Sequence, residues 1–386
     1  MDNELLKDEA VQAEACGTAH RIARLRELMD ERGYDAVVLR NNADLRWLTG
    51  AERTFDDEVA HTAFVTAEGQ WLHTDSRYYN SFCERLGANG PWQIDMENVS
   101  AQQWVANRIV AARARVMAIE DTVTLGFYDA LETACREASI APAFPRLHAD
   151  IQRLRMVKDE EELALLKEAQ RITDESFEYI CGFIAPGQTE QQIRAELENY
   201  LLSHGADGLS FGTIIAAGPN GANPHAQPGE YVIKEGDLIV MDYGALYHDY
   251  HADMTRTVCV GQPSERQRAV YDIVRKAHEE CAAMVRPGIV GKDVHDHSVK
   301  VISDAGYGAF YGHGLGHGVG IEIHELPGFG RGWDKPVPAG SVVTIEPGIY
   351  LPGEFGIRLE DCGVVTENGY EPFTASSHDL RVIPVG

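Results

Sequence analysis

The stretch that decides the fold is Tyr311–Pro327, which reads YGHGLGHGVGIEIHELP. Three histidines, His313, His317 and His324, stand among five glycines and a short apolar run. Glycine tolerates positive φ and lets another segment or a ligand approach closely, so a glycine-rich run with several imidazoles is typical of a pocket. A flexible surface loop with incidental histidines is the alternative, and this stretch alone leaves both open. The carboxylates elsewhere in the chain favour the pocket.

The bulk composition restricts the classes of partner. The chain has 386 residues, more than one hydrophobic core usually contains, which predicts two domains. Its formal net charge of -26 argues against nucleic acid and anionic membranes, because both attract basic surfaces. The acidic N-terminus lacks the apolar segment of a secretory signal, and no apolar run approaches the ~20 residues that span a bilayer.

The cysteines indicate the redox compartment. There are seven, an odd number, and none is paired as C-x-x-C. This pattern is typical of reduced thiols rather than of a disulfide framework or a thiolate zinc site. We therefore expect a cytoplasmic protein whose cysteines serve mostly as small packing residues.

Residues 1–152 are predicted to form the first domain. Strand-like runs such as 35–39 alternate there with helical stretches such as 20–32 and 101–112. This alternation indicates an α/β domain. It contains no dense cluster of chemical groups, so we interpret it as a packing or subunit-contact domain.

Residues 153–386 are predicted to form the second domain. It begins with a long amphipathic helix that Asp159 caps, and Thr189 with Gln192 predicts a capping box for the next helix. Strand-like runs follow, interrupted by two further helices. Helices outside and a mostly antiparallel sheet inside indicate an α+β domain.

Four acids lie in or against apolar strand-like runs of this second domain: Asp242, Asp253, Glu346 and Glu360. An unpaired carboxylate in such a place costs several kcal/mol to desolvate. Four converging carboxylates also repel one another, and two divalent cations would balance their four charges. With His317 as a fifth ligand, the pattern predicts a two-metal site whose bridging carboxylates hold the ions ~3.5–4 Å apart.

The ligand types indicate the metal. Hard oxygen atoms with one imidazole suit Mn²⁺, and they also accept Co²⁺ or Zn²⁺. His313 and His317 have the i, i+4 spacing of a helical zinc pair, but the glycines between them disfavour a helix. His324 and Glu325 are followed by Leu-Pro, so the H-E-x-x-H motif of helical zinc proteases is absent.

Four segments resemble, in order, the signatures of the pita-bread metallopeptidases. They are VMDYGALYHDYHADMTRTV, HGLGHGVGIEIHE, TIEPGIY and GIRLEDCGVV, within a match that covers about 155–386. Asp253 follows Asp242 by eleven positions, as in that family. The segment RIARLRELMDERGYDAVVLRNNADLRWLTG resembles the creatinase-type N-terminal domain of the proline-specific branch. The resemblance implies a creatinase-type domain followed by a pita-bread catalytic domain.

The resemblance also implies a role for each metal ligand. Asp242 would chelate one metal, and His317 and Glu346 would bind the other. Asp253 and Glu360 would bridge both. A hydroxide that bridges the two metals would attack the scissile carbonyl carbon of an Xaa-Pro bond.

Further positions match the family's substrate and proton groups. Glu346 would carry a proton to the leaving nitrogen. His225 and His324 would contact the substrate and stabilise the tetrahedral oxyanion, while His313 would line the pocket. Arg358 would orient the ligating carboxylates from behind. The resemblance further implies small peptide substrates and a homodimer.

The substrate length is where the resemblance departs from a simple match. A dipeptidase needs a cation for the free carboxylate of its substrate. Many dipeptidase relatives have an arginine directly after the HE-x-P segment, where this chain has Gly328. Either Arg331, the nearest arginine, takes over the task or another group does. The resemblance favours a dipeptidase, with an aminopeptidase for longer peptides as the alternative. A metal-dependent lyase is disfavoured, because such relatives carry an acid where this chain has Gly244.

Overall fold

The computed structural model describes residues 2–56, 58–87 and 90–385, and for residues 2–16 it describes the backbone alone. The described chain forms two compact units, which divide between Arg155 and Met156. Among the helices of the described residues, none combines the length and the apolar composition needed to cross a bilayer.

The N-terminal unit is built on one mixed sheet with the strand order β4-β3-β2-β1-β5. Its central strands are fully buried, and α4 and α5 pack on it through an apolar cluster that includes Trp104, Phe127 and Leu131. The predicted α/β character is therefore seen in this unit, although no prediction covers α5. The elements are α1 (Asp2–Arg32), β1 (Ala36–Leu39), α2 (Asn42–Thr49), β2 (Thr62–Thr66), β3 (Gln70–His73), α3 (Tyr79–Leu86), β4 (Gln93–Asp95), α4 (Ala101–Ala112), β5 (Met117–Ile119), α5 (Leu125–Glu137) and α6 (Asp150–Arg155).

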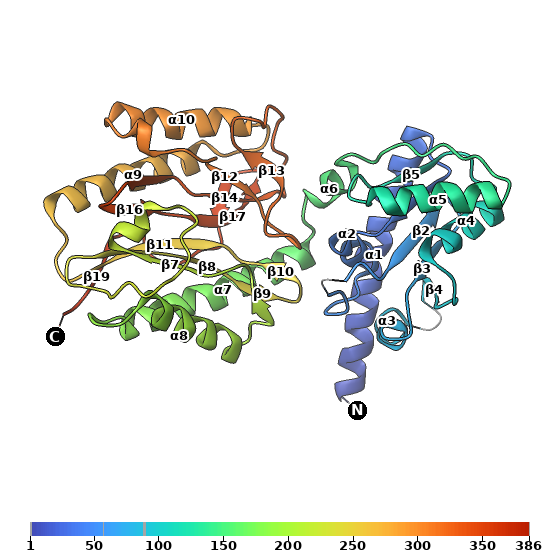
Figure 1. Ribbon diagram of the computed structural model, residues 1–386, viewed down its shortest axis with the longest axis horizontal. Helices are drawn as coiled ribbons and strands as arrows, with labels where there is room; N and C mark the ends of the chain where they lie inside the picture. The colour runs from blue at the N-terminus through green and yellow to red at the C-terminus, as the bar shows by residue number, and fades with distance from the viewer. Residues whose placement is uncertain (1, 57, 88–89, 386) are drawn as a thin grey trace. The chain divides into compact units, whose positions relative to one another are not determined.

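The C-terminal unit has sheets inside and helices outside (Figure 1). Helices α7 and α8 lie against one side of the strands and α9 and α10 against the other. The helices are α7 (Glu160–Phe183), α8 (Glu190–Ser203), α9 (Glu265–Met284) and α10 (Gly291–Asp304), with short 3₁₀ turns η1 (Gly218–Ala222) and η2 (Gly308–Phe310). Both predicted helix starts are confirmed, because Asp159 and Thr189 each form a capping box.

The strands of this unit pair in antiparallel fashion, except for β11 with β19. The two larger sheets have the orders β19-β11-β8-β7 and β13-β12-β14-β17-β18. The strands are β6 (Gly208–Leu209), β7 (Ile214–Ala217), β8 (Leu238–Tyr243), β9 (Ala245–Tyr247), β10 (Tyr250–His251), β11 (Met254–Val260), β12 (Gly316–Gly318), β13 (Glu325–Phe329), β14 (Val342–Ile345), β15 (Gly348–Leu351), β16 (Phe355–Arg358), β17 (Asp361–Thr366), β18 (Gly369–Pro372) and β19 (Arg381–Ile383).

The glycines of the opening stretch serve close packing. A Cβ on Gly316 would lie 2.1 Å from the carbonyl oxygen of Thr344, and one on Gly318 would lie 2.4 Å from that of Leu326. No residue of 311–327 has positive φ. Of the two reasons that the sequence offered for these glycines, close approach is therefore correct and positive φ is wrong. They let β12 lie between β13 and β14.

The run 356–365 is two strands rather than one. Strand β16 ends at Arg358 and pairs with β15, whereas β17 begins at Asp361 and joins the five-stranded sheet. Glu360 lies at the break between them, and this residue is buried, with 1% of its surface exposed. The change of sheet thus places a carboxylate at the point where strands from different sheets meet.

Candidate metal centre

All five residues that the sequence predicts as metal ligands line one cavity of about 420 Å³. They come from distant parts of the chain. Asp242 is on β8, Asp253 precedes β11, and His317 is on β12. Glu346 follows β14 and Glu360 precedes β17. Strand ends from several sheets therefore bring the predicted ligand set to a single point.

The ligand atoms lie close to one another. His317 Nε2 is 3.5 Å from Asp253 Oδ2 and 3.4 Å from Glu346 Oε1. Asp253, His317 and Glu360 each offer one ligand atom, and these atoms lie within 4.8 Å of one another. Ligand atoms bonded to one metal ion at about 2.0–2.2 Å are separated by distances of this order.

The electrostatics of the acids show why they need a cation. Burial, together with the charges of Asp242 and Glu346, raises the pKa of Asp253 well above its ordinary value. Burial and the charge of Asp253 do the same to the pKa of Glu360. Burial and the charge of Asp242 raise the pKa of Glu346 to about 8. Burial and mutual repulsion thus disfavour the ionised acids, and a nearby divalent cation would reverse both effects.

The free ligand atoms fit a metal. Asp242 Oδ1 is buried and has no hydrogen-bond partner among the described residues, which leaves its lone pairs available. Burial and the neighbouring His324 lower the pKa of His317 to about 4, so its imidazole is neutral. Its Nδ1 lies 3.1 Å from the Gly318 carbonyl and donates to it, which turns Nε2 toward the acids as an acceptor.

Two threonines form hydrogen bonds to the predicted ligands, and the sequence analysis predicts neither of these threonines. Thr255 donates from Oγ1 to Glu360 Oε2 at 2.6 Å. Thr344 accepts from the backbone N–H of His317 at 3.1 Å and donates to Glu346 Oε1 at 3.4 Å. Thr255 lies two positions after Asp253, and Thr344 lies two positions before Glu346, so each shares a strand face with a predicted ligand. That spacing is the signal by which they could have been found.

Arg358 begins a chain of hydrogen bonds behind Asp242. Its Nη2 pairs with Asp242 Oδ2, its Nη1 donates to the Tyr350 hydroxyl at 2.8 Å, and its Nε donates to Thr255 Oγ1 at 3.0 Å. His313 donates from Nδ1 to the Gly314 carbonyl at 2.7 Å, so its Nε2 accepts from the Tyr350 hydroxyl at 2.9 Å. The predicted position of Arg358 behind the carboxylates agrees with this geometry.

Tyr350 is the central member of this chain and was missed by sequence reasoning. Its side chain is buried, and burial raises the pKa of its hydroxyl to about 12, so it remains a donor at neutral pH. It connects His313 on the cavity wall to Arg358 and hence to Asp242. The segment TIEPGIY contains it, but nothing in that segment indicates which side chains it touches.

The remaining predicted site residues are divided. His225 and His324 both line the cavity, and the rings of His317 and His324 lie 4.3 Å apart. Arg331 is exposed and is not among the residues that line the cavity. It lies near α10, where its charge acts on His295 and Asp296. The structure therefore brings together every predicted site residue except Arg331.

Comparison with known protein families identifies both domains of the chain. The model of metallopeptidase family M24 matches residues 164–367, and that of the creatinase/prolidase N-terminal domain matches residues 21–157. The Xaa-Pro dipeptidase of Lactobacillus delbrueckii subsp. lactis is 36% identical over 94% of this chain and 98% of its own length.

Solved structures give the same answer. The Xaa-Pro dipeptidase from Bacillus anthracis superposes with a TM-score of 0.88 at 33% identity, over 95% of this chain and 99% of that one. The X-Pro aminopeptidase from Thermotoga maritima MSB8 gives 0.84 at 31% identity, over 94% of this chain and 100% of that one. The predicted fold, a creatinase-type domain followed by a pita-bread domain, is confirmed. This chain belongs to metallopeptidase family M24, whose members hydrolyse peptide bonds with the help of bound metal.

Proposed function

We propose that this chain hydrolyses Xaa-Pro peptide bonds, with dipeptides as its substrates, at a centre that holds two divalent metal ions. One observation carries the proposal: Asp242, Asp253, His317, Glu346 and Glu360 converge on one cavity in a member of family M24. Two such ions would supply a hydroxide at neutral pH and would polarise the scissile carbonyl. We propose Mn²⁺ as the preferred ion, since four of the five ligands are carboxylates.

The protein's own side chains have separate tasks in this proposal. His225 and His324 contact the substrate at the cavity wall and donate to the oxygen that becomes negatively charged. Glu346 takes the proton of the attacking water and passes it to the proline nitrogen. Arg358 fixes Asp242 from behind, and Tyr350 fixes His313, so that both present one orientation to the cavity.

A specific observation favours the second candidate, an Xaa-Pro aminopeptidase for longer peptides. Arg358 is the one arginine or lysine among the described residues that line the cavity. It already donates to Asp242, to Tyr350 and to the Pro224 carbonyl at 3.2 Å. The dipeptidase proposal therefore requires another cation, for which Arg331 is the candidate, whereas an aminopeptidase requires none.

A substrate panel separates the two candidates. The metal-loaded protein is assayed with Ala-Pro, Ala-Pro-Ala, Ala-Ala and Ala-Ala-Ala. A dipeptidase cleaves Ala-Pro with the highest kcat/KM, and a preference for Ala-Pro-Ala would replace the first candidate by the second. Cleavage of the proline-free peptides at equal rates would contradict both. Arg331→Ala should raise KM for Ala-Pro while leaving kcat unchanged, and an unchanged KM removes Arg331 from the proposal.

The lyase is disfavoured by packing as well as by sequence. A Cβ on Gly244 would lie 1.9 Å from the carbonyl oxygen of Ala252, so an acid at this position would require the backbone to move.

We further propose that the protein is a cytoplasmic homodimer and that its domains are 1–152 and 153–386. Sedimentation that finds only monomers at micromolar concentration would contradict the dimer, and cell fractionation tests the compartment.

A further inference from the structure

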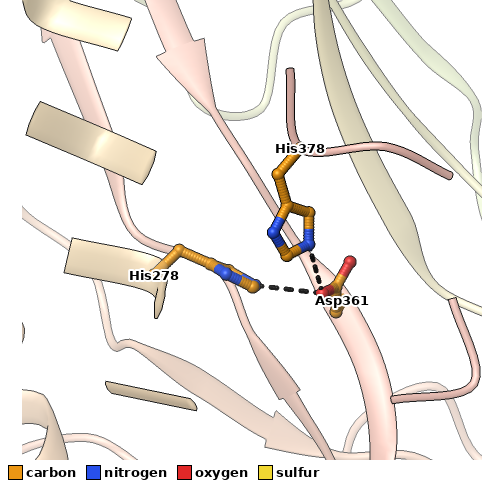
Figure 2. Close-up of side chains that lie close together, drawn as sticks. All are labelled: His278, Asp361 and His378. Carbon is orange, nitrogen blue, oxygen red and sulfur yellow. Dashed lines mark hydrogen bonds and ion pairs between the residues drawn. The ribbon is translucent and has the colours of Figure 1, made fainter. Parts of the chain in front are cut away.

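A second group of potential ligands lies apart from the proposed centre, and none of its members lines the cavity of that centre. It consists of His278 on α9, Asp361 on β17 and His378 in the segment between β18 and β19 (Figure 2). Asp361 Oδ2 is 2.7 Å from His378 Nε2 and 3.5 Å from His278 Nε2. The dashed lines of Figure 2 meet at this carboxylate, so both imidazoles are directed at one oxygen atom.

His278 is the unusual member of the group. The residue is fully buried, and neither of its ring nitrogens has a hydrogen-bond partner among the described residues. Burial lowers the pKa of His278 to about 4, so the ring is neutral and carries a free lone pair. A buried polar group without a protein partner is rare in native proteins, and a bound ion or water is a common partner for such a group.

Asp361 has one oxygen atom available for an ion. Its Oδ1 accepts from Arg256 Nη2 at 2.7 Å, whereas its Oδ2 faces the two histidines. Arg256 is itself held by the carbonyls of Glu360 and Ser376 at 2.6 and 2.7 Å. The arginine thus fixes the plane of the carboxylate and leaves Oδ2 as a single, oriented acceptor.

We propose that His278 Nε2, His378 Nε2 and Asp361 Oδ2 bind a zinc ion, at a site distinct from the proposed two-metal centre. Ligand atoms of a tetrahedral zinc ion with bonds near 2.0 Å are about 3.3 Å apart. The observed 3.5 and 2.7 Å bracket this value, so rotation of the half-exposed His378 would complete the geometry. A water molecule would take the fourth position from the side of His378.

The ligand types select the class of ion. Two imidazoles and one carboxylate suit zinc, and also cobalt or nickel, whereas calcium and magnesium prefer a shell of oxygen atoms. The positive charge of Arg256 further disfavours ions that depend on negative charge alone. The proposed main centre, with four carboxylates, has the opposite preference.

Binding has a simple proton balance. The N–H to carboxylate hydrogen bond between His378 and Asp361 is replaced by a bond from each of these residues to zinc. With zinc on Nε2, the ring proton of His378 resides on Nδ1, which lies 3.9 Å from Glu279 Oε1. Such a carboxylate behind a ligating histidine is a usual partner for the second ring nitrogen. No oxidation or bond cleavage is involved.

Bound zinc would stabilise the folded C-terminal unit by joining three of its segments. The three ligands belong to α9, to the five-stranded sheet and to the segment that leads to β19. An ion bound to the folded state alone stabilises it in proportion to its affinity and concentration. Zinc would therefore tie the C-terminal segment to the outer helix.

The test counts zinc in matched variants of the full chain. Metal-free protein is saturated with Zn²⁺, desalted, and analysed by inductively coupled plasma mass spectrometry. His278→Gln and His378→Gln each remove one imidazole, and glutamine at 378 retains a donor for Asp361. His297→Gln is the control, since His297 on α10 bonds Glu280 on α9 at 2.8 Å and is outside the group.

We expect both test variants to lose one zinc ion per chain relative to the wild type, and the control to lose none. With Mn²⁺ already at the main centre, added Zn²⁺ should raise the Tm of the wild type and of the control but not of the test variants. Equal zinc content in all four proteins would overturn the proposal. So would a zinc-dependent rise in Tm that survives in His278→Gln, the variant that loses no hydrogen bond.

Discussion

Glu360 and Asp361 are consecutive carboxylic acids where β17 begins: Glu360 precedes the strand and Asp361 is its first residue. Their environments shift their pKa values in opposite directions. Burial and the charge of Asp253 raise the pKa of Glu360 well above its ordinary value. Asp361 is equally buried, and burial alone would raise its pKa too. The hydrogen bond from His378 and the charge of Arg256 nevertheless hold the pKa of Asp361 well below its ordinary value.

The difference shows what makes a buried acid functional. Asp361 has its counter-ion within the protein, so its charge contributes to stability. Glu360 shares its cavity with three other acids, and Arg358, the arginine of that cavity, pairs with Asp242 instead. Successive residues of a strand point to opposite faces, which is how one chain segment serves both purposes.

The largest effect is expected from the cavity side. Asp253→Asn removes a proposed bridging ligand, and metal catalysis supplies several kcal/mol of transition-state stabilisation, so kcat/KM should fall on the order of a thousandfold. Steady-state kinetics with Ala-Pro measures it, and metal analysis should show lost metal. Full activity after exhaustive chelation would contradict the proposal that the acids of the cavity act by binding metal.

The two neighbours should respond oppositely when neutralised in metal-free protein. Asp361→Asn leaves Arg256 buried without its carboxylate and should lower the free energy of unfolding by about 3–5 kcal/mol. Glu360→Gln relieves repulsion and should leave the free energy of unfolding unchanged or raise it. Urea unfolding monitored by circular dichroism measures both. A loss of several kcal/mol in both variants would show that the two sides do not differ.

A third prediction tests the hydrogen bonds that link Arg358 to His313 through Tyr350 at the cavity wall. Tyr350→Phe removes the hydroxyl that joins them. His313 Nε2 then lacks its donor and Arg358 Nη1 keeps the Pro224 carbonyl alone, a change that costs about 1–3 kcal/mol. We expect kcat/KM to fall about tenfold with the metal content unchanged. A loss of bound metal in this variant would mean that the hydroxyl supports the ligands themselves rather than the substrate side.

His61 is a buried titratable residue without a strong charged partner, so it shows the effect of burial on a pKa without the effect of ion pairing. Burial lowers the pKa of His61, in the N-terminal unit, to about 4, below its ordinary 6.5. The folded state then binds the proton less strongly than the unfolded state. The stabilising contribution is complete above pH 6.5 and is lost as the pH falls toward 4.

His61 should contribute at most about 1.4 kcal/mol per pH unit to the slope in that window, which corresponds to one proton. His61→Gln should flatten it, as urea unfolding at pH 7, 6 and 5 would show. His148→Gln is the control, because that histidine is exposed in the same unit. An equal slope in wild type and His61→Gln would mean that burial of this ring is not what shifts its titration.

Sequence reasoning found the proposed ligands because each is fixed by a local pattern. An acid at the end of an apolar strand is visible in isolation, and the glycine-rich stretch marks His317. Helix starts at Asp159 and Thr189 were predictable for the same reason, since a capping box spans four residues. The role of Tyr350 was not predictable, because its partners are 8 and 37 positions away.

The amino-acid sequence by itself determined the family, the fold class and the set of groups that converge on the cavity. The family and the fold class follow from the resemblance of its signature segments, and the set of groups also follows from the cost of burying four acids in apolar strand-like runs. The tertiary structure decided which cations and hydroxyls meet those acids, that Arg331 lies away from them, and that His278 and His378 face Asp361. The physical reason is that pKa values and ion sites depend on distances of a few ångströms between side chains that are far apart in the chain.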